Sequence, residues 1–211
     1  MSSSYPHGFE GGVSIQNTPI NILASDQGFT VWVDSNTGSD GIFGATAGFY
    51  SPANQQQGTF KKPFKTIVGA INYLNTVSKK DGGDVIYVAA GHVENIIAAG
   101  TLTIANPGIT IVFLGEGAQK ATINYTTIVS ASIVVSGANI TLVNPRFTCN
   151  FDALTSPITV TGADFKLIGG EWHDAAAKAA TNCIVASNAA ARLTIDGWKF
   201  FASTTGTQKA T

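Results

Sequence analysis

The chain has 211 residues, and only 12% of them are Asp, Glu, Lys or Arg, which is about half the share in an average soluble domain. Hydrophobic residues reach 44% and the net charge is -1, so charge-driven disorder is excluded. A coiled coil needs many Glu, Lys and Arg residues, and an electrostatic nucleic-acid binder needs a basic surface. The composition opposes both classes, and we expect no nucleic-acid partner.

The first residues and the hydropathy give two expectations about targeting. Residues 1–8 contain no Lys or Arg and no apolar run follows them, so we expect no signal peptide. The longest apolar run, residues 85–90, is far shorter than the ~20 residues that a membrane-spanning helix needs. We therefore expect a protein that is made in the cytoplasm and has no membrane partner.

The N-terminal part of the chain differs from the remainder in charge. Residues 1–60 contain four acidic residues and no Lys or Arg, whereas the remainder carries all 12 basic residues. Prolines and glycines in residues 1–25 oppose a helix, and alternating apolar residues there favour short strand pairing. We predict an extended arm over residues 1–28, followed by a β-domain over residues 29–211.

The β-domain opens with a strand and a long polar loop. Apolar residues alternate along residues 29–33, which predicts a strand, and residues 34–58 are rich in Gly, Ser, Asn and Gln, which predicts a loop. The stretch from Asp34 to Asp40 is superficially similar to a calcium-binding loop. Its twelfth position is Ala45, however, which offers no side-chain oxygen. We predict a structured turn there, with no metal and no cofactor.

One helix is predicted, over about residues 63–79. Its apolar positions recur with the 3.6-residue period and form one stripe. The stripe consists of Ile67, Ala70, Ile71, Leu74 and Val77. Pro63 suits the first turn, where its missing N–H has no partner in any case. We expect this helix to cover the N-terminal edge of the repeat that follows it, because an uncovered strand edge promotes aggregation.

A repeat with a period near 25 residues follows the helix. In each of four segments an apolar-x-apolar pair is followed by a second such pair. The first pairs begin at Leu102, Ile133, Ile158 and Ile184, and the second pairs begin at Ile109, Ile140, Phe165 and Leu193. An earlier pair, beginning at Ile86, precedes the second series by 23 residues. Because each short turn of chain needs neighbours to bury its apolar side, the period favours an all-β parallel β-helix of four to five turns over an antiparallel sandwich.

The last three repeats also match in charged and aromatic residues. Equivalent positions predict an outward ladder of alternating charge, formed by Arg146, Glu171 and Lys199. The next position in each repeat predicts an inward aromatic stack, formed by Phe147, Trp172 and Phe200. An outward column of β-branched residues is either a stack in solvent or an oligomer face. That column contains Val134, Thr159 and Val185.

Catalytic equipment is sparse in this sequence. A polysaccharide lyase needs clustered carboxylates and a basic proton acceptor, and a glycosidase needs two facing carboxylates. No two equivalent repeat positions both present an outward acid, so we predict no catalytic residue and a protein that is not an enzyme. Asp164 falls at a corner and is predicted as a turn residue. Cys149 and Cys183 are predicted as small buried or half-buried residues of a reduced chain.

Three stretches of the β-domain resemble the opening of right-handed parallel β-helix proteins of the pectate-lyase-like superfamily. They are Val31-Trp32-Val33-Asp34 with Gly38-Ser39-Asp40-Gly41, Lys62-Pro63-Phe64 with Ala70-Ile71, and Tyr87-Val88 with Gly91-His92-x-Glu94. The resemblance covers about residues 29–200. It implies the right-handed fold and carries over no catalytic residue.

The start of the chain is similar to short β-helix proteins of tailed bacteriophages. The matching residues are Tyr5-Pro6-His7-Gly8-Phe9, Val13-x-Ile15 and Thr18-Pro19-Ile20. That resemblance implies a homotrimeric virion structural protein, made in the bacterial host cytoplasm and placed on the phage capsid surface. Our leading hypothesis is a capsid decoration, or cement, protein. Its arm would bind the major capsid protein or another virion subunit through Tyr5, Pro6, Phe9, Val13 and Ile15.

Two other functions stay open. A tail spike, or receptor-binding protein, would bind or depolymerise host polysaccharide, and the small number of coil turns opposes it. A carbohydrate-binding module would hold a glycan on the outer face, with Trp172 as the first residue to test, because tryptophan stacks on the apolar faces of sugars.

Overall fold

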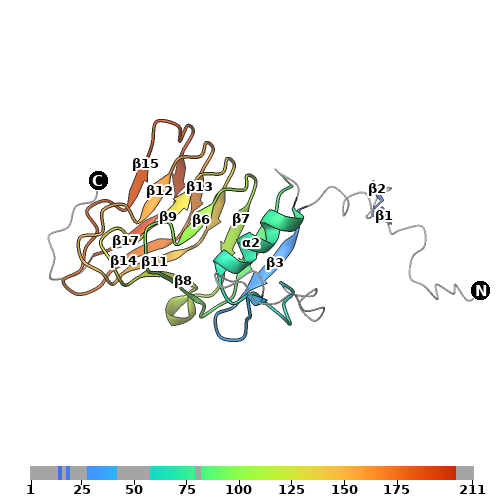
Figure 1. Cartoon of the computed structure of the whole chain (residues 1–211), viewed down its shortest axis with the longest axis horizontal. Helices are drawn as coiled ribbons and strands as arrows, with labels where there is room; N and C mark the ends of the chain where they lie inside the picture. The colour runs from blue at the N-terminus through green and yellow to red at the C-terminus, as the bar shows by residue number, and fades with distance from the viewer. Residues whose placement is uncertain (1–13, 16–17, 20–27, 42–57, 79–81, 203–211) are drawn as a thin grey trace, which may run out of the picture.

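The computed structural model describes residues 14–15, 18–19, 28–41, 58–78 and 82–202. Over most of that length the chain is a β-solenoid, in which short strands stack in parallel into three sheets (Figure 1). One α-helix, α2 (Ile67–Val77), lies at the N-terminal end of the stack. The predicted parallel β-helix is therefore confirmed at the level of the fold.

The three sheets share the turns of the coil. The six-stranded sheet consists of β3 (Thr30–Val33), β4 (Val85–Val88), β7 (Thr110–Phe113), β10 (Thr141–Val143), β13 (Lys166–Ile168) and β16 (Thr194–Asp196). The five-stranded sheet consists of β5 (Val93–Ile96), β8 (Thr122–Tyr125), β11 (Arg146–Cys149), β14 (Glu171–Asp174) and β17 (Lys199–Phe201). The four-stranded sheet consists of β6 (Leu102–Ile104), β9 (Ile133–Val135), β12 (Ile158–Val160) and β15 (Ile184–Ala186). The chain visits the sheets in turn, so β4 to β15 make four complete turns, with the short helix η3 (Gly117–Gln119) between β7 and β8.

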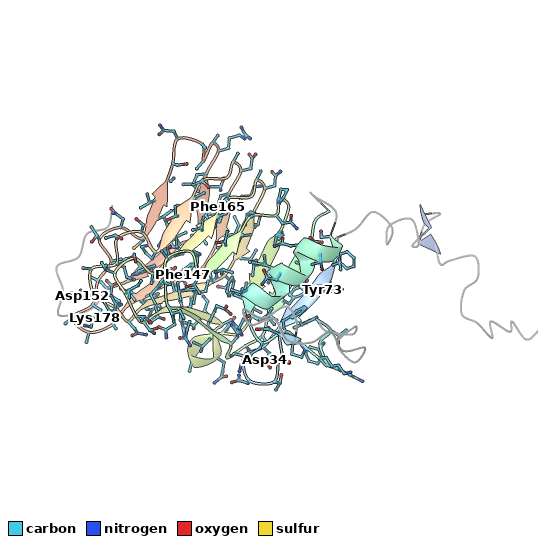
Figure 2. All side chains as sticks on the ribbon, viewed as in Figure 1. Asp34, Tyr73, Phe147, Asp152, Phe165 and Lys178 are labelled. Carbon is cyan, nitrogen blue, oxygen red and sulfur yellow. The ribbon has the colours of Figure 1, made fainter. Side chains whose placement is uncertain are left out.

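The apolar core runs along the inside of the coil. Buried residues alternate with half-buried ones along β7 and β8, because successive side chains of a strand point to opposite faces. Equivalent side chains of successive turns therefore stack in columns. Ile111, Leu142 and Leu167 form one such column, and each is at most 1% exposed. Phe147 and Phe165, both fully buried, lie within this interior in Figure 2.

Strand register agrees with the repeat, with one exception. Ile158 pairs with Ile133 on one side and with Ile184 on the other, as the period predicts. The earlier pair is displaced: Ile86 lies beside Ile111, so the true offset is 25 residues and not the 23 that the apolar pattern indicated. The first complete turn therefore has the same length as the later ones.

The corners of the coil use left-handed backbone conformations. One corner recurs in four turns, with φ between 57° and 79°. Its residues are Gly108, Asn139, Asp164 and Arg192. Glycine and asparagine adopt this conformation at low cost. Asp164 is thus confirmed as a turn residue, and the guanidinium of Arg192 binds its two carboxylate oxygens at 2.5 Å each.

The helix starts later than the sequence indicated. Thr66 is the N-cap residue, and its hydroxyl accepts a main-chain N–H of the first turn at 2.9 Å. The prediction that the helix opens at Pro63 is wrong, because this part of the chain runs alongside β3. The Phe64 N–H donates to the carbonyl of Trp32 at 2.8 Å, which holds the segment extended up to the cap.

The apolar face of α2 closes the N-terminal end of the coil. Its buried apolar residues, which pack toward β3, β4 and β6, are Ile67, Ala70, Ile71 and Leu74. Val77, the fifth residue of the predicted stripe, is 39% exposed. Neither α2 nor any other helix of the described residues is long and apolar enough to cross a membrane.

Little of the predicted arm belongs to the described part of the chain. β1 (Ser14–Ile15) and β2 (Thr18–Pro19) pair with each other in antiparallel register, which agrees with the short strand pairing expected there. Ile15 pairs with Thr18. The other proposed contact residues, Tyr5, Pro6, Phe9 and Val13, lie outside the described residues.

Candidate functional site

The predicted oligomer face is a single column on the outside of the four-stranded sheet. Thr159 pairs with Val134 on β9 and with Val185 on β15, so the three residues stack at successive turns. Each of them is half-buried. The structure thus brings the three residues together, and their role as an oligomer face stays a prediction.

Two carboxylates of the loop after β3 are occupied by neighbouring groups. Asp34 accepts the Asn36 N–H at 2.9 Å and the Thr37 hydroxyl at 2.7 Å, which makes a tight turn (Figure 2). Asp40 accepts two main-chain N–H groups, at 2.8 and 2.9 Å, from the two residues just ahead of α2. Within the described ranges, no group of three or more His, Cys, Asp or Glu side chains is placed to hold a metal ion. The two carboxylates therefore fix the loop to itself and to the start of the helix.

A buried polar pair links that loop to β5 and α2. His92 is fully buried, and Glu94 is 4% exposed. The Ser35 N–H donates to His92 Nδ1 at 3.0 Å, so the ring proton is assigned to Nε2, which donates to Glu94 Oε2 at 3.0 Å. The same carboxylate oxygen accepts the N–H of Ile67, the first residue of α2, at 2.9 Å. A carboxylate is stabilising at this place, because the free N–H groups of a helix start carry partial positive charge.

Ser35, His92 and Glu94 are the residue types of a nucleophilic triad, and a cavity of about 260 Å³ lies beside them. In a triad, an imidazole nitrogen accepts the proton of the nucleophile's hydroxyl. Here His92 Nδ1 accepts the main-chain N–H of Ser35, while Ser35 Oγ accepts the Val93 N–H at 3.1 Å. The ring nitrogen that a base would use is therefore occupied, and the group ties loop, strand and helix together.

Glu94 is a residue whose role the sequence patterns did not reveal. It occupies the inward position that Ile123, Phe147 and Trp172 fill in later turns. A lone acid in an otherwise apolar column was the available signal, because a buried carboxylate needs a partner.

A charged cluster lies on the outside of the five-stranded sheet. Arg146 and Glu171 pair in register, and Arg146 Nε lies 2.6 Å from Glu171 Oε1, as the predicted ladder requires. Lys120 Nζ, outside the repeat, lies 3.7 Å from Glu171 Oε2, and His173 Nε2 lies 3.3 Å from Oε1. Lys199 follows in register on β17 and is exposed. Burial raises the pKa of Glu171, but the hydrogen bond from Arg146 and the charges of Lys120 and Arg146 outweigh burial and lower it.

The inward aromatic stack is confirmed, and it removes one candidate. Phe147 and Trp172 are fully buried, with ring centroids 6.1 Å apart and planes inclined by 26°, and Phe200 is half-buried. Trp172 Nε1 donates to Asp174 Oδ1 at 2.7 Å, and burial raises the pKa of this carboxyl against the effect of the hydrogen bond. Trp172 cannot stack on a sugar in this position, so its choice as the first residue to test for glycan binding is wrong.

Cys149 and Cys183 are free thiols, buried and half-buried respectively, as predicted. Cys149 Sγ donates to the carbonyl of Phe151 at 3.1 Å. Burial, aided by the nearby charge of Asp174, raises the pKa of both thiols to about 12. Both therefore stay protonated at neutral pH, and a protonated thiol is a poor nucleophile.

No protein-family model, no curated protein and no solved structure matches this chain. The class of the protein is therefore the one that the fold defines, a β-solenoid with parallel sheets and a helix at its N-terminal end. Within it, Asp40, Glu94 and Glu171 each hold one structural element to another.

Proposed function

We propose that this chain is a non-enzymatic structural protein of a tailed-phage virion, a decoration (cement) protein of the capsid. In this proposal the solenoid is right-handed and pectate-lyase-like, and the N-terminal arm anchors it to the shell. The observation that carries the proposal is how the polar side chains are used. Asp40, Glu94 and Glu171 are bound by main-chain N–H groups or basic side chains that hold the coil together, which suits a rigid scaffold.

The arm supplies the attachment in this proposal. Its apolar anchors contact the major capsid protein or another virion subunit, and they are Tyr5, Pro6, Phe9, Val13 and Ile15. A segment with glycine breaks and little charge can become ordered on binding and wrap a large surface, at a cost in entropy. Three copies associate side by side through the column of Val134, Thr159 and Val185, whose β-branched side chains stack on neighbouring strands.

Particle binding of a truncated chain tests this proposal. We expect residues 26–211 to keep the circular dichroism of the full chain and to lose attachment to particles that lack the protein. A full-length variant with Tyr5, Phe9, Val13 and Ile15 all replaced by Ser should bind at least about tenfold more weakly, because few apolar anchors dominate such contacts. Ile97→Ser is the control, since Ile97 is an exposed apolar residue of the body. Full occupancy by the truncated chain would refute the role of the arm.

One observation favours the alternative of a tail spike or receptor-binding protein. The outer face of the five-stranded sheet carries a column of polar and aromatic residues, formed by Asn95, Asn124, Thr148, His173 and Phe201. Asn124 donates to Asn95 at 3.0 Å, and the rings of His173 and Phe201 stack with centroids 4.5 Å apart. Amides and an exposed ring suit the hydroxyls and apolar faces of a glycan. This alternative predicts glycan binding that Phe201→Ala abolishes, or new reducing ends from host polysaccharide, and the decoration role predicts neither.

A further inference from the structure

The last turn of the coil exposes residues that form the core in earlier turns. Ile195 is 46% exposed, although Leu167, its partner in register, is fully buried. Leu193 is 36% exposed, whereas Phe165, one turn earlier, is fully buried. Exposed apolar area costs free energy in water roughly in proportion to its size, so this end favours a partner that covers it.

The main chain is open at the same end. Among the described residues, β15, β16 and β17 are each the last strand of their sheet, so one side of each strand meets no further strand there. Figure 1 shows β15 and β17 at the end of the coil opposite to α2. Open strand edges are templates for pairing with another chain. Because α2 covers the other end, a second copy cannot add its N-terminal end to this edge.

We infer that two copies of this chain associate end to end, through the last turns of their coils. A two-fold axis perpendicular to the coil axis reverses the direction in which the chain runs around the coil. Strands of the two copies then meet in antiparallel pairs, with main-chain N–H and C=O groups opposite each other. Such an interface uses the same patch on both copies and closes at two, whereas a head-to-tail contact would continue into a filament.

The charges beside one corner place the two-fold axis. Asp196 ends β16, Lys199 begins β17, and the two residues between them turn the corner. Both charged side chains are exposed. An axis through this corner sets β16 of one copy against β17 of the other, so Asp196 of each copy lies beside Lys199 of the other. The interface then has two equivalent ion pairs next to its apolar centre, and complementary charges of this kind fix the orientation of partners.

Sedimentation equilibrium of the full chain measures this association directly. We expect an even number of copies, which is two, or six if three-fold association through the Val134 column also occurs. Ile195→Asp should halve that number, because it puts a carboxylate into the apolar centre of the interface. Ile97→Asp is the matched control, since Ile97 is 55% exposed and lies just after β5, far from the last turn. An odd number of copies, one or three, at every concentration would overturn the inference.

A charge exchange tests the position of the axis. Asp196→Lys and Lys199→Asp each bring like charges together twice, so each variant should dissociate about tenfold more readily. An equimolar mixture restores both ion pairs between unlike chains and should recover wild-type association, as should the double variant. Lys166→Asp changes an exposed charge one turn inward and should have no effect. Single variants that associate normally, or a mixture that stays dissociated, would rule out this axis.

The end-to-end association does not rest on the proposed function. Arm variants should keep the mass of the wild type in solution, and Ile195→Asp should still attach to particles. Failure of one proposal is therefore distinguishable from failure of the other.

Discussion

At the scale of single residues, the start of α2 depends on a carboxylate that needs room. Asp40 accepts the N–H groups of the two residues ahead of the helix. Gly69, in the first turn, faces the same carboxylate, and a Cβ there would lie 2.3 Å from Asp40 Oδ1. The glycine is thus explained by the space that the capping carboxylate occupies.

Gly69→Ala should destabilise the protein by about 1–2 kcal/mol, although Ala is favoured over Gly in helices by about 1 kcal/mol. The added methyl group displaces Asp40 from the main-chain N–H groups that it accepts. In the Asp40→Ala background the clash is absent, so the same substitution should stabilise by up to about 1 kcal/mol. Urea unfolding of the four proteins measures both effects, and simple additivity would disprove the explanation.

The Arg146–Glu171 pair makes a prediction about pH. The pKa of Glu171 is lowered from its usual 4.5, so the folded state binds this proton less readily than the unfolded state. The pair therefore stabilises the fold above about pH 4.5, and this contribution is lost as the pH falls through the lower pKa of the folded state.

Arg146→Met should cost about 1–2 kcal/mol near neutral pH, because it removes a hydrogen bond to a mostly buried carboxylate. The difference from the wild type should shrink below about pH 4, as Glu171 becomes protonated. Unfolding free energies over this pH range provide the measurement. Lys199→Met, at the exposed end of the ladder, should change stability by less than about 0.5 kcal/mol. A cost of Arg146→Met that does not vary with pH would show that the pair is not its source.

At the scale of elements, the strands follow from the sequence pattern, and the start of the helix does not. Strands of successive turns pair residue by residue, so equal spacing along the chain becomes equal register. The helix start depends on Thr66 and on Asp40, which lies 26 residues from it. A local pattern contains no trace of this contact, and it favoured Pro63 instead. Lys120 was missed in the charge ladder for a related reason, because it lies outside the repeat.

The candidate site divides in the same way. The column around Thr159 was predictable, because its members recur with the period of the coil. The link between His92, Glu94 and α2 was not, because it joins three elements through main-chain N–H groups that no residue pattern displays. The predicted arm contacts, apart from Ile15, lie outside the described residues, so they stay predictions.

Glu94→Leu should destabilise the protein by about 2–3 kcal/mol, even though leucine suits the apolar column in which Glu94 stands. The change leaves the Ile67 N–H and the His92 Nε2–H buried without their acceptor. Glu94→Gln keeps a carbonyl oxygen at the site and should cost less than half as much. Unfolding experiments combined with hydrogen exchange at the Ile67 amide measure this effect. A neutral or stabilising Glu94→Leu would show that the network does not hold the helix.

At the scale of the whole molecule, stability comes from contacts between neighbouring turns. A residue in a middle turn packs against two neighbours, and a residue in the last turn packs against one. Leu142→Ala should therefore cost about 2–4 kcal/mol, whereas Ile195→Ala should cost less than about 1 kcal/mol at protein concentrations too low for association. Chemical unfolding measures both values, and equal costs would be inconsistent with an open last turn.

The whole molecule is proposed to coat a capsid, and electron cryomicroscopy of purified virions tests that role most directly. We predict density for a short solenoid on the capsid surface, with strands about 4.8 Å apart and the N-terminal arm in contact with shell subunits. Absence of the protein from purified virions, or its confinement to the tail, would contradict the decoration role.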